Sequence, residues 1–439
     1  MNPRIVEVLV FFLYGSKLSQ SLSGQKVRRE KTFEKRIFKI AFVPRILLLL
    51  LLYTIFQSVY GDAFGFEAAD AKFYHDLGLD FSAAFSENHF GQTFTQYNDE
   101  IDLSDMGYAV YVGFIYWLTG NSIIVVRLIK CVLSSITVVL MYRLAKRNFG
   151  EQTGRIAAIF IALWPNFWYY CTAHLKEVEM TFLAVLFVEQ ADQMLRSRQF
   201  TAWKVVPILI IALALFTVRT PLGLVALLSL VFSIFMSSQR VVSWGKRIVV
   251  GVMAIALIGV IGGEQLERKA RGLMDNRSAQ QEQGLQNAAT RKNGNVYAKY
   301  AGAAVFAPMI FTIPFPSMVR PFDGQNVHQF NNGGNFVKNI MSGFTIFALA
   351  MLIISGKWRE HLLPLSMMIG YVIVLAFSAF AQSERFHQPA MPFEFMFAAY
   401  GLSIAVTKPK YKRWFTYWCV LMFVAAIAWN WFKLKGRGM

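Results

Sequence analysis

The amino-acid sequence predicts an all-α protein that crosses a membrane many times. Hydrophobic residues make up 55% of its 439 residues, whereas charged residues make up only 16%. An average soluble domain has about 45–50% apolar and about 25% charged residues, and a soluble core of this length cannot bury the excess apolar surface. The composition therefore excludes a disordered chain, a collagen-like fibre and an ordinary cytosolic enzyme, and it favours a polytopic membrane protein.

The charge balance fits the same class. The chain has 44 Lys and Arg residues against 26 Asp and Glu residues, which gives a formal net charge of +18. In a membrane protein such an excess collects in cytoplasmic loops and at anionic lipid headgroups, so we expect membrane lipids and no nucleic acid as partners. The three cysteines lie in apolar runs, and no spacing of Cys and His indicates a metal site.

Apolar segments of sufficient length recur along the whole chain. A membrane-spanning helix needs about 20 mostly apolar residues, and the sequence contains about eleven such segments. The predicted spans are 42–60, 122–145, 154–170, 178–195, 203–217, 221–236, 247–263, 336–355, 362–380, 391–406 and 414–432.

Basic residues give these spans an orientation. Lys and Arg precede the first span and recur in every second loop, for example at Arg147 and Arg196, and such loops are cytoplasmic. The rule holds if the short apolar stretch 107–119 lies along the outer surface as a juxtamembrane helix. The chain then divides into an N-terminal cytoplasmic or interfacial segment 1–41, a core 42–263 with a first outer loop 61–106, a second outer loop 264–335, and C-terminal helices 336–439.

The first outer loop is rich in carboxylates. Glu67, Asp70 and Tyr74 follow one another at helical spacing, so on a helix they share one face. A carboxylate held in a partly desolvated cleft beside the bilayer can act as a general base on a hydroxyl group. The alternative is that these acids merely solvate an outer loop, and the residues alone leave both interpretations open.

Several short motifs follow one another between about residues 60 and 195. They are Asp70 with Tyr74, Gly107-Tyr108, Gly120, Arg127, the run Arg147-Asn148-Phe149-Gly150, and Trp164-Pro165. In this pattern the segment resembles polyprenyl-phosphate-dependent glycosyltransferases of the GT-C class, of the bacterial protein O-mannosyltransferase and lipid A aminoarabinose transferase type. Ala71 stands where this family often has a second acid. The resemblance implies a GT-C-like fold in a bacterial inner membrane, with the active site facing the periplasm.

The same resemblance implies a reaction. Asp70 would be the catalytic base that deprotonates an acceptor hydroxyl on a lipid, a glycan or a protein. The hydroxyl oxygen would then attack the anomeric carbon of a polyprenyl-phosphate-linked sugar and invert its configuration. Neither the residues nor the resemblance requires a resident cofactor. Some relatives hold a divalent ion with the first-loop acid, so a divalent cation stays open, with Glu67 as the second carboxylate.

Three further polar sets are candidates for binding the substrate. Lys176 and Glu177 lie in the short turn between the third and fourth spans, where ionisable residues are functional candidates. Arg219 separates the fifth and sixth spans, and an Arg there can clamp a phosphate. Arg385 and His387 lie in a Pro-containing segment before the tenth span. The alternatives are snorkelling surface charges, an interfacial anchor and a local ion pair with Glu384.

Two other functions compete with this interpretation. A polysaccharide polymerase or ligase that uses polyprenyl-diphosphate glycans also needs outer arginines, and the long loop 264–335 keeps that alternative open. A transporter of lipid-linked glycans would hold its charges near the middle of the bilayer. Most predicted spans have apolar centres, with Arg127 and Lys130 as exceptions, so the transporter is the least favoured.

Overall fold

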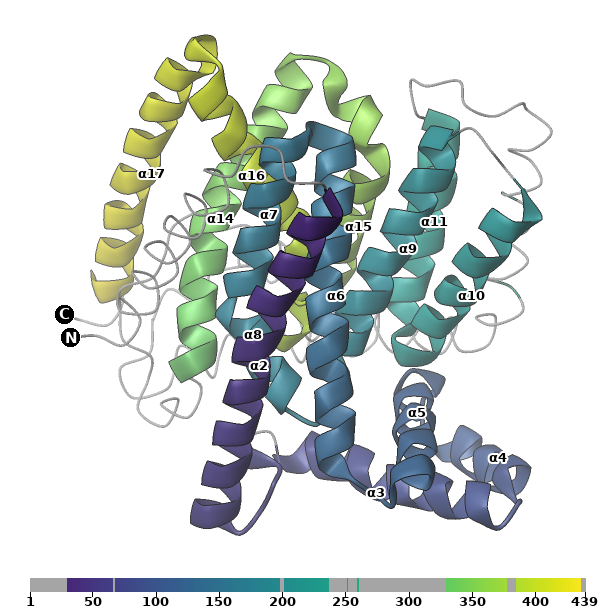
Figure 1. The fold of residues 1–439 in the computed structure, drawn as a ribbon. Coiled ribbons are helices and arrows are strands. Elements are labelled where there is room, and N and C mark those ends of the chain that lie inside the picture. Colours follow the sequence, from purple (N-terminus) through teal and green to yellow (C-terminus); the bar gives the residue numbers. More distant parts are fainter. Residues whose placement is uncertain are drawn as a thin grey trace.

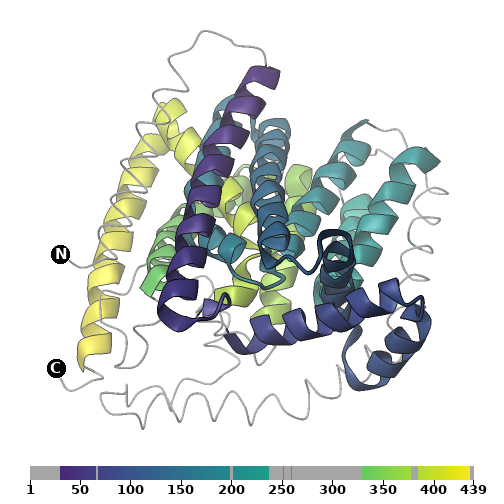
Figure 2. The same ribbon diagram turned by 60° about the horizontal axis from the view of Figure 1, so that its bottom comes forward.

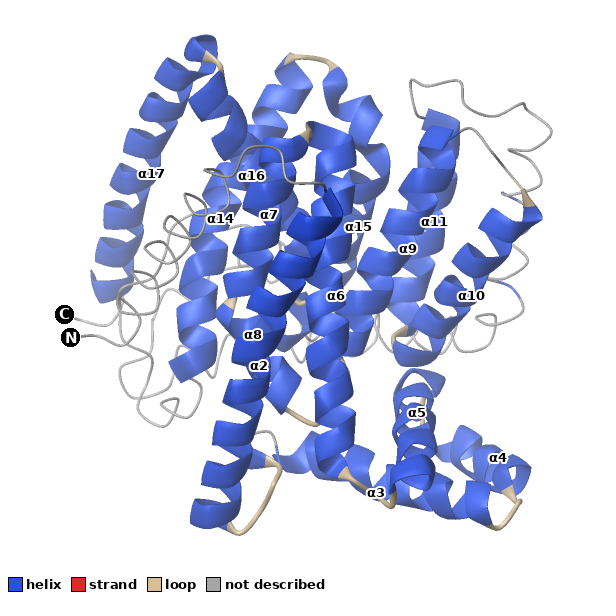
Figure 3. Cartoon of the chain, in the orientation of Figure 1, coloured by secondary structure: helices blue, strands red, loops and turns tan. Residues whose placement is uncertain are grey.

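The protein is a bundle of long helices with a small helical layer across one end (Figure 1). The computed structural model describes residues 30–65, 68–197, 201–236, 251, 259, 329–376 and 384–435. Within these residues the regular elements are all helices, and none is a strand (Figure 3). The all-α class predicted from the composition is therefore confirmed for the described part of the chain.

The bundle contains most of the predicted apolar segments. Its helices run side by side, and α17 stands at its edge (Figure 1). The 3₁₀ turns η4 (Lys357–His361) and η5 (Glu384–His387) precede α15 and α16. The bundle helices are α2 (Glu30–Tyr60), α6 (Ile123–Phe149), α7 (Glu151–Leu163), α8 (Pro165–Thr172), α9 (Glu177–Ser197), α10 (Ala202–Val218), α11 (Thr220–Met236), α14 (Gln329–Ile354), α15 (Leu362–Ala376), α16 (Met391–Thr407) and α17 (Pro409–Lys435).

Five of the described helices are long and apolar enough to cross a membrane: Thr32–Tyr60, Ile123–Phe149, Asn335–Ile354, Lys357–Ala376 and Pro409–Phe432. Three shorter apolar helices accompany them, Trp203–Val218, Thr220–Met236 and Met391–Thr407. This set is consistent with a polytopic membrane protein, whereas a total of about eleven crossings stays a prediction. The predicted span 247–263, apart from positions 251 and 259, and residues 264–328 of the second outer loop lie outside the described residues.

The first outer segment, which we expected as an extended loop, is mostly helical. It forms α3 (Ala68–Ser86) and α4 (Phe90–Glu100), and the juxtamembrane helix α5 (Leu103–Thr119) follows. These three helices lie across one end of the bundle (Figure 2). Helix α5 ends where Gly120 adopts the left-handed conformation, with φ 66°, which glycine enters without a steric penalty.

The predicted span 154–170 is divided into two helices, α7 and α8. Trp164 between them has an extended backbone, with ψ 117°, as expected of the residue before a proline. Pro165 has no N–H group to donate to the Ile161 carbonyl oxygen, so that carbonyl loses its α-helical donor. The buried Arg45 of α2 donates to the carbonyl oxygens of Ile161 and Ala162 at 3.3 Å each. The buried guanidinium group of Arg45, on the apolar helix α2, thus donates hydrogen bonds to the C-terminal end of α7.

Helix α5 approaches α10 very closely. A Cβ atom built on Gly107 would meet the carbonyl carbon and oxygen of Thr217 nearer than real Cβ atoms ever come to a neighbour. Thr217 is the residue before the last of α10, and Arg219 follows that helix. Glycine at position 107 therefore lets the N-terminal end of α5 lie against the end of α10.

The far end of α6 carries an ion-pair network. Arg147 binds Glu189 and Asp192 of α9 at 2.9 and 2.8 Å. Arg196 binds Asp192 at 2.9 Å and Asn148 at 2.6 Å. These basic residues are among those that the sequence assigns to the cytoplasmic side, and acids of α9 hold them.

We predict that Gly107→Ala lowers the free energy of unfolding by about 1–3 kcal/mol, because the added methyl group must push α5 away from α10. Thermal and denaturant unfolding of the purified protein in detergent measures this change. Gly91→Ala in α4 is the matched control, since a Cβ there meets nothing within 4 Å. It should lie within about 1 kcal/mol of wild type. Equal effects of the two substitutions would contradict the close approach of α5 and α10.

Candidate functional site

A cluster of charged side chains lies where the helical layer meets the bundle. It brings together residues from α3 and α5, from the N-terminal end of α9 with the turn before it, and from η5. Asp70 is in the first turn of α3 and Glu177 is in the first turn of α9. Carboxylates are favourable at helix N-termini because of the helix dipole, so both helices begin with a suitable acid.

Arg385 joins two carboxylates from distant parts of the chain. Its Nη1 donates to Oδ2 of Asp70 at 2.5 Å, and its Nε donates to Oε1 of Glu177. The Glu177 side chain is fully buried, that of Arg385 is 11% exposed, and that of Asp70 is 55% exposed. The row therefore runs from a buried acid, through a guanidinium group, to an acid that solvent can reach.

A second row lies beside the first. The Lys176 ammonium group and the Tyr74 hydroxyl both donate to Oδ1 of Asp105, the latter at 2.7 Å. Lys176 also donates to the carbonyl oxygen of Ser104 at 2.6 Å. Its side chain is 1% exposed, whereas that of Asp105 is 36% exposed. Here too, a buried partner holds a carboxylate that faces outward.

The neighbouring charges set the ionisation of the two rows. Burial alone would raise the pKa of Asp105, but Lys176 and the Tyr74 hydroxyl lower it to below its ordinary value. Burial opposes the charge of Arg385, yet Glu177 and Asp70 raise the pKa of its guanidinium group above the usual range. At neutral pH the site therefore contains a permanent cation and an ionised carboxylate at Asp105.

Arg219 adds a second guanidinium group. It lies at the break between α10 and α11, where its own backbone is extended. Its guanidinium carbon lies 4.3 Å from the centre of the Phe386 ring, and that of Arg385 lies 5.3 Å from the same centre. Arg219 also lies near the Tyr371 side chain of α15. Two arginines around one aromatic ring make a region suited to an anion such as a phosphate.

Two predicted site residues do not take part in these rows. The buried His387 instead has its Nδ1 atom 3.2 Å from the ammonium group of Lys338 on α14. Glu67 lies outside the described residues. In the part of the chain that the structure describes, no group of three His, Cys, Asp or Glu side chains could hold a metal ion, so a cation shared by Asp70 and Glu67 stays a prediction.

Lys130 of α6 supports the turn that carries Lys176 and Glu177. The Lys130 ammonium group donates to the carbonyl oxygen of Leu175 and lies 3.5 Å from Oε2 of Glu179. Lys130 is in the second turn of α6, near its N-terminal end. A charge that the sequence places within an apolar span thus binds the turn before α9.

Sequence reasoning missed Asp105 as a member of the site. It counted among the many acids of the first outer segment, and nothing in its immediate neighbours separates it from Asp99 or Asp102. The available signal is its position two residues before Gly107-Tyr108, in the first turn of an apolar helix. That position places it at the same end as the other helix N-termini.

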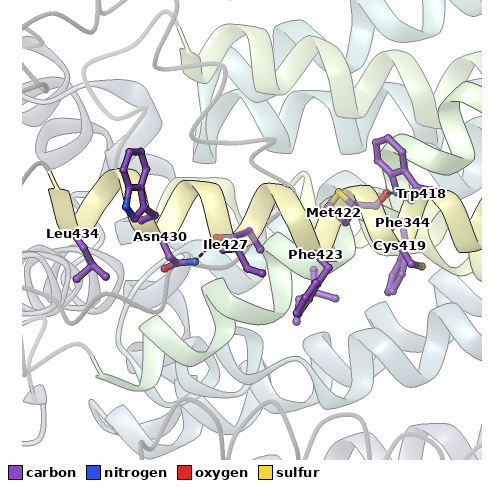
Figure 4. A pocket seen from close by; sticks show the side chains of 12 residues that line it. Phe344, Trp418, Cys419, Met422, Phe423, Ile427, Asn430 and Leu434 are labelled. Carbon is purple, nitrogen blue, oxygen red and sulfur yellow. Dashed lines mark hydrogen bonds between the residues drawn. The ribbon is translucent and has the colours of Figure 1, made fainter.

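An apolar groove lies away from this cluster, between α14 and α17 (Figure 4). Its volume is about 580 Å³, and Ile340, Phe344, Trp418 and Phe423 are among its lining residues. The indole of Trp418 donates to the carbonyl oxygen of Gly343 at 2.9 Å and connects the two helices. Most of the lining residues are apolar, and none of them is charged, so the groove offers contact surface.

A comparison with known protein families indicates which class of protein the chain is similar to. Residues 107–262 match the family model described as dolichyl-phosphate-mannose-protein mannosyltransferase. The match supports a membrane glycosyltransferase of the GT-C type. It confirms the resemblance noted from the sequence, and it covers Lys176, Glu177 and Arg219 but neither Asp70 nor Arg385. No curated protein and no solved structure matches the chain significantly.

We predict that Arg385→Met lowers the free energy of unfolding by about 3 kcal/mol, because it leaves the buried Glu177 without its counterion. Adding Glu177→Gln should recover part of this loss, since the double variant buries no unpaired charge. Denaturant unfolding in detergent micelles measures the free energies of unfolding of wild type, Arg385→Met and the double variant.

Arg143→Met is the control for this cycle. Arg143 pairs with Glu34 at 2.6 Å, but its side chain is 49% exposed, so its loss should cost at most about 1 kcal/mol. If Arg385→Met costs no more than Arg143→Met, Glu177 does not depend on Arg385 for neutralisation.

Proposed function

We propose that this protein transfers a sugar from a polyprenyl-phosphate donor to a hydroxyl group on a lipid, glycan or protein acceptor. The observation that carries the proposal is the row of Asp70, Arg385 and Glu177 at one end of a chain whose residues 107–262 match a mannosyltransferase family. An exposed carboxylate can act as a base, and a neighbouring buried guanidinium group can bind a phosphate.

Asp70 is the proposed general base. Its carboxylate takes the proton of the acceptor hydroxyl while the hydroxyl oxygen forms a bond to the anomeric carbon of the sugar. The bond from that carbon to the phosphate oxygen breaks, and the lipid phosphate leaves with the electron pair. Attack from the side opposite the phosphate inverts the anomeric configuration.

Arg385 and Arg219 are the proposed phosphate ligands. Both lie against Phe386, and fixed cations stabilise the charge that develops on the leaving phosphate. The phosphate also offers Arg385 an alternative to Asp70. Glu177 would keep Arg385 in place during this exchange, because it binds a different nitrogen of the guanidinium group. The exchange would release Asp70 to meet the acceptor. Lys176 and Tyr74 would support the substrate side through Asp105, and His387 through the segment that carries Arg385.

The cluster is proposed to face the outer, periplasmic side of a bacterial inner membrane. Lys130 lies next to the turn of the cluster, whereas Arg147 lies 17 residues farther along α6, which corresponds to about 25 Å of helix. The basic residues around Arg147 and Arg196 favour the cytoplasm. The cluster, at the other end of α6, then falls outside.

A polymerase or ligase that uses polyprenyl-diphosphate glycans is the second candidate. The pair of arginines around Phe386 also suits a diphosphate. The family match to a monophosphate-dependent mannosyltransferase favours the first candidate.

We predict that Asp70→Asn lowers kcat by about 10²–10⁴-fold, because Asn keeps the shape of the side chain but cannot accept the proton. The assay uses purified protein, polyprenyl-phosphate and polyprenyl-diphosphate sugars, and a membrane lipid extract as acceptor. Asp80→Asn is the control. Asp80 is an exposed acid farther along α3 that accepts a hydrogen bond from Tyr97 at 2.6 Å, and its loss should leave the rate within about twofold of wild type.

Three outcomes separate the candidates. Transfer from the monophosphate donor that depends on Asp70 supports the proposal. Transfer by Asp70→Asn at the wild-type rate would remove Asp70 from the mechanism. Reaction with diphosphate-linked glycans alone would establish the polymerase or ligase.

A further inference from the structure

Asp105 has the geometry of a substrate-binding carboxylate. Tyr74 from α3 and Lys176 from the turn before α9 both bind its Oδ1 atom. In the part of the chain that the structure describes, the ion pair and the side-chain hydrogen bonds of Asp105 all use this one oxygen. The side chain is 36% exposed, and the contacts through Oδ1 leave the lone pairs of Oδ2 for a ligand while they hold the group in place.

We propose that Asp105 contacts the transferred sugar and that its Oδ2 atom accepts hydrogen bonds from the sugar hydroxyl groups. The inference rests on the proposed function, since it assigns the sugar of that donor to this carboxylate. Neither the family match nor the sequence motifs assign a role to Asp105, which precedes the matched segment.

The two rows of the cluster place Asp105 beside the reacting groups. Asp70 and Tyr74 are one helical turn apart on α3, and Lys176 and Glu177 are consecutive in the chain. The Asp105 row therefore runs alongside the Asp70 row. Both end in an exposed carboxylate, and a ligand whose phosphate reaches Arg385 can have its sugar next to Asp105.

Charge decides which part of the donor meets Asp105. A carboxylate repels a phosphate, so the phosphate belongs with Arg385 and Arg219. An ionised carboxylate has only acceptor sites, and a neutral sugar presents several hydroxyl donors. A hydrogen-bonded carboxylate thus suits the sugar and disfavours the opposite orientation of the donor.

A purely structural role for Asp105 would require fewer contacts than the structure shows. Neutralising the buried Lys176 requires a carboxylate nearby, but it does not require that carboxylate to be held by Tyr74 as well. The Tyr74 ring is itself packed, edge to face, on Tyr108 at 4.9 Å between ring centres. This rigid support is what a site needs to discriminate between hydroxyl patterns, because an analogue that lacks the hydroxyl leaves the fixed acceptor unpaired.

The test compares two ligands that carry the same single negative charge. Polyprenyl-phosphate mannose has the sugar, and polyprenyl methyl phosphate lacks it. We expect wild type to bind the sugar-bearing diester at least about tenfold more tightly, and Asp105→Asn to reduce that preference to about twofold or less. Titration of the intact purified protein in nanodiscs, followed by intrinsic tryptophan fluorescence, gives both dissociation constants.

The ratio of the two constants separates recognition from folding. A disturbed fold weakens the binding of both ligands, whereas loss of the sugar contact weakens only the binding of the sugar-bearing diester. Asp80→Asn should keep the wild-type ratio, since its carboxylate is also bound by a tyrosine but lies farther along α3. Asp105→Glu is the second variant. It retains the charge for Lys176 but displaces the carboxylate, so it should also lose most of the preference.

The possible results distinguish failure of this inference from failure of the proposed function. If both Asp105 variants keep the wild-type ratio, Asp105 does not recognise the sugar. If both variants lose affinity for the two ligands equally, the role of Asp105 is structural, and the inference also fails. If wild type transfers sugar with Asp70 as base while the ratio is unchanged in Asp105→Asn, the inference fails and the proposed function stands. If wild type binds neither diester, both fail.

Discussion

Arg385 connects parts of the chain that are far apart in sequence. It lies 315 residues from Asp70 and 208 residues from Glu177, and it binds both with one guanidinium group. A buried charge is costly unless it is paired, so η5 packs on the bundle where the buried Glu177 meets Arg385, and the exposed Asp70 is a second partner of the same guanidinium group. This one constraint brings together the layer that carries α3, the start of α9 and the segment before α16.

The same requirement explains the other charges among the apolar helices. Arg45 binds the carbonyl oxygens of Ile161 and Ala162 at the C-terminal end of α7, and Lys130 binds the carbonyl oxygen of Leu175. Each charge satisfies a backbone group that the bilayer could not hydrate. Lys130 lies near the N-terminal end of α6, where it binds the turn before α9, rather than at the centre of that helix, and this location disfavours a transporter.

Part of the candidate site could be predicted from the sequence. The spacing of Asp70 and Tyr74 predicted a shared helix face, and both belong to α3. Glu177 and Arg385 were named from separate segments, and the structure brings them into contact with each other. Their chemical roles stay proposals. Asp105 could not be singled out, because the outer segment offers many acids and only the folded chain shows which one meets Lys176.

Local sequence determined the class of protein and the elements that build it. Apolar length predicted helices in a membrane, Pro165 divides one of the predicted spans, and Gly120 ends α5, since each of these effects acts within a few residues. Tertiary structure decided the partners. His387 is next to Lys338 instead of joining Arg385 in the cluster, and Asp105 lies between Tyr74 and Lys176. Such pairings depend on which helix ends meet in space, and residue spacing within one segment carries no information about segments hundreds of residues away.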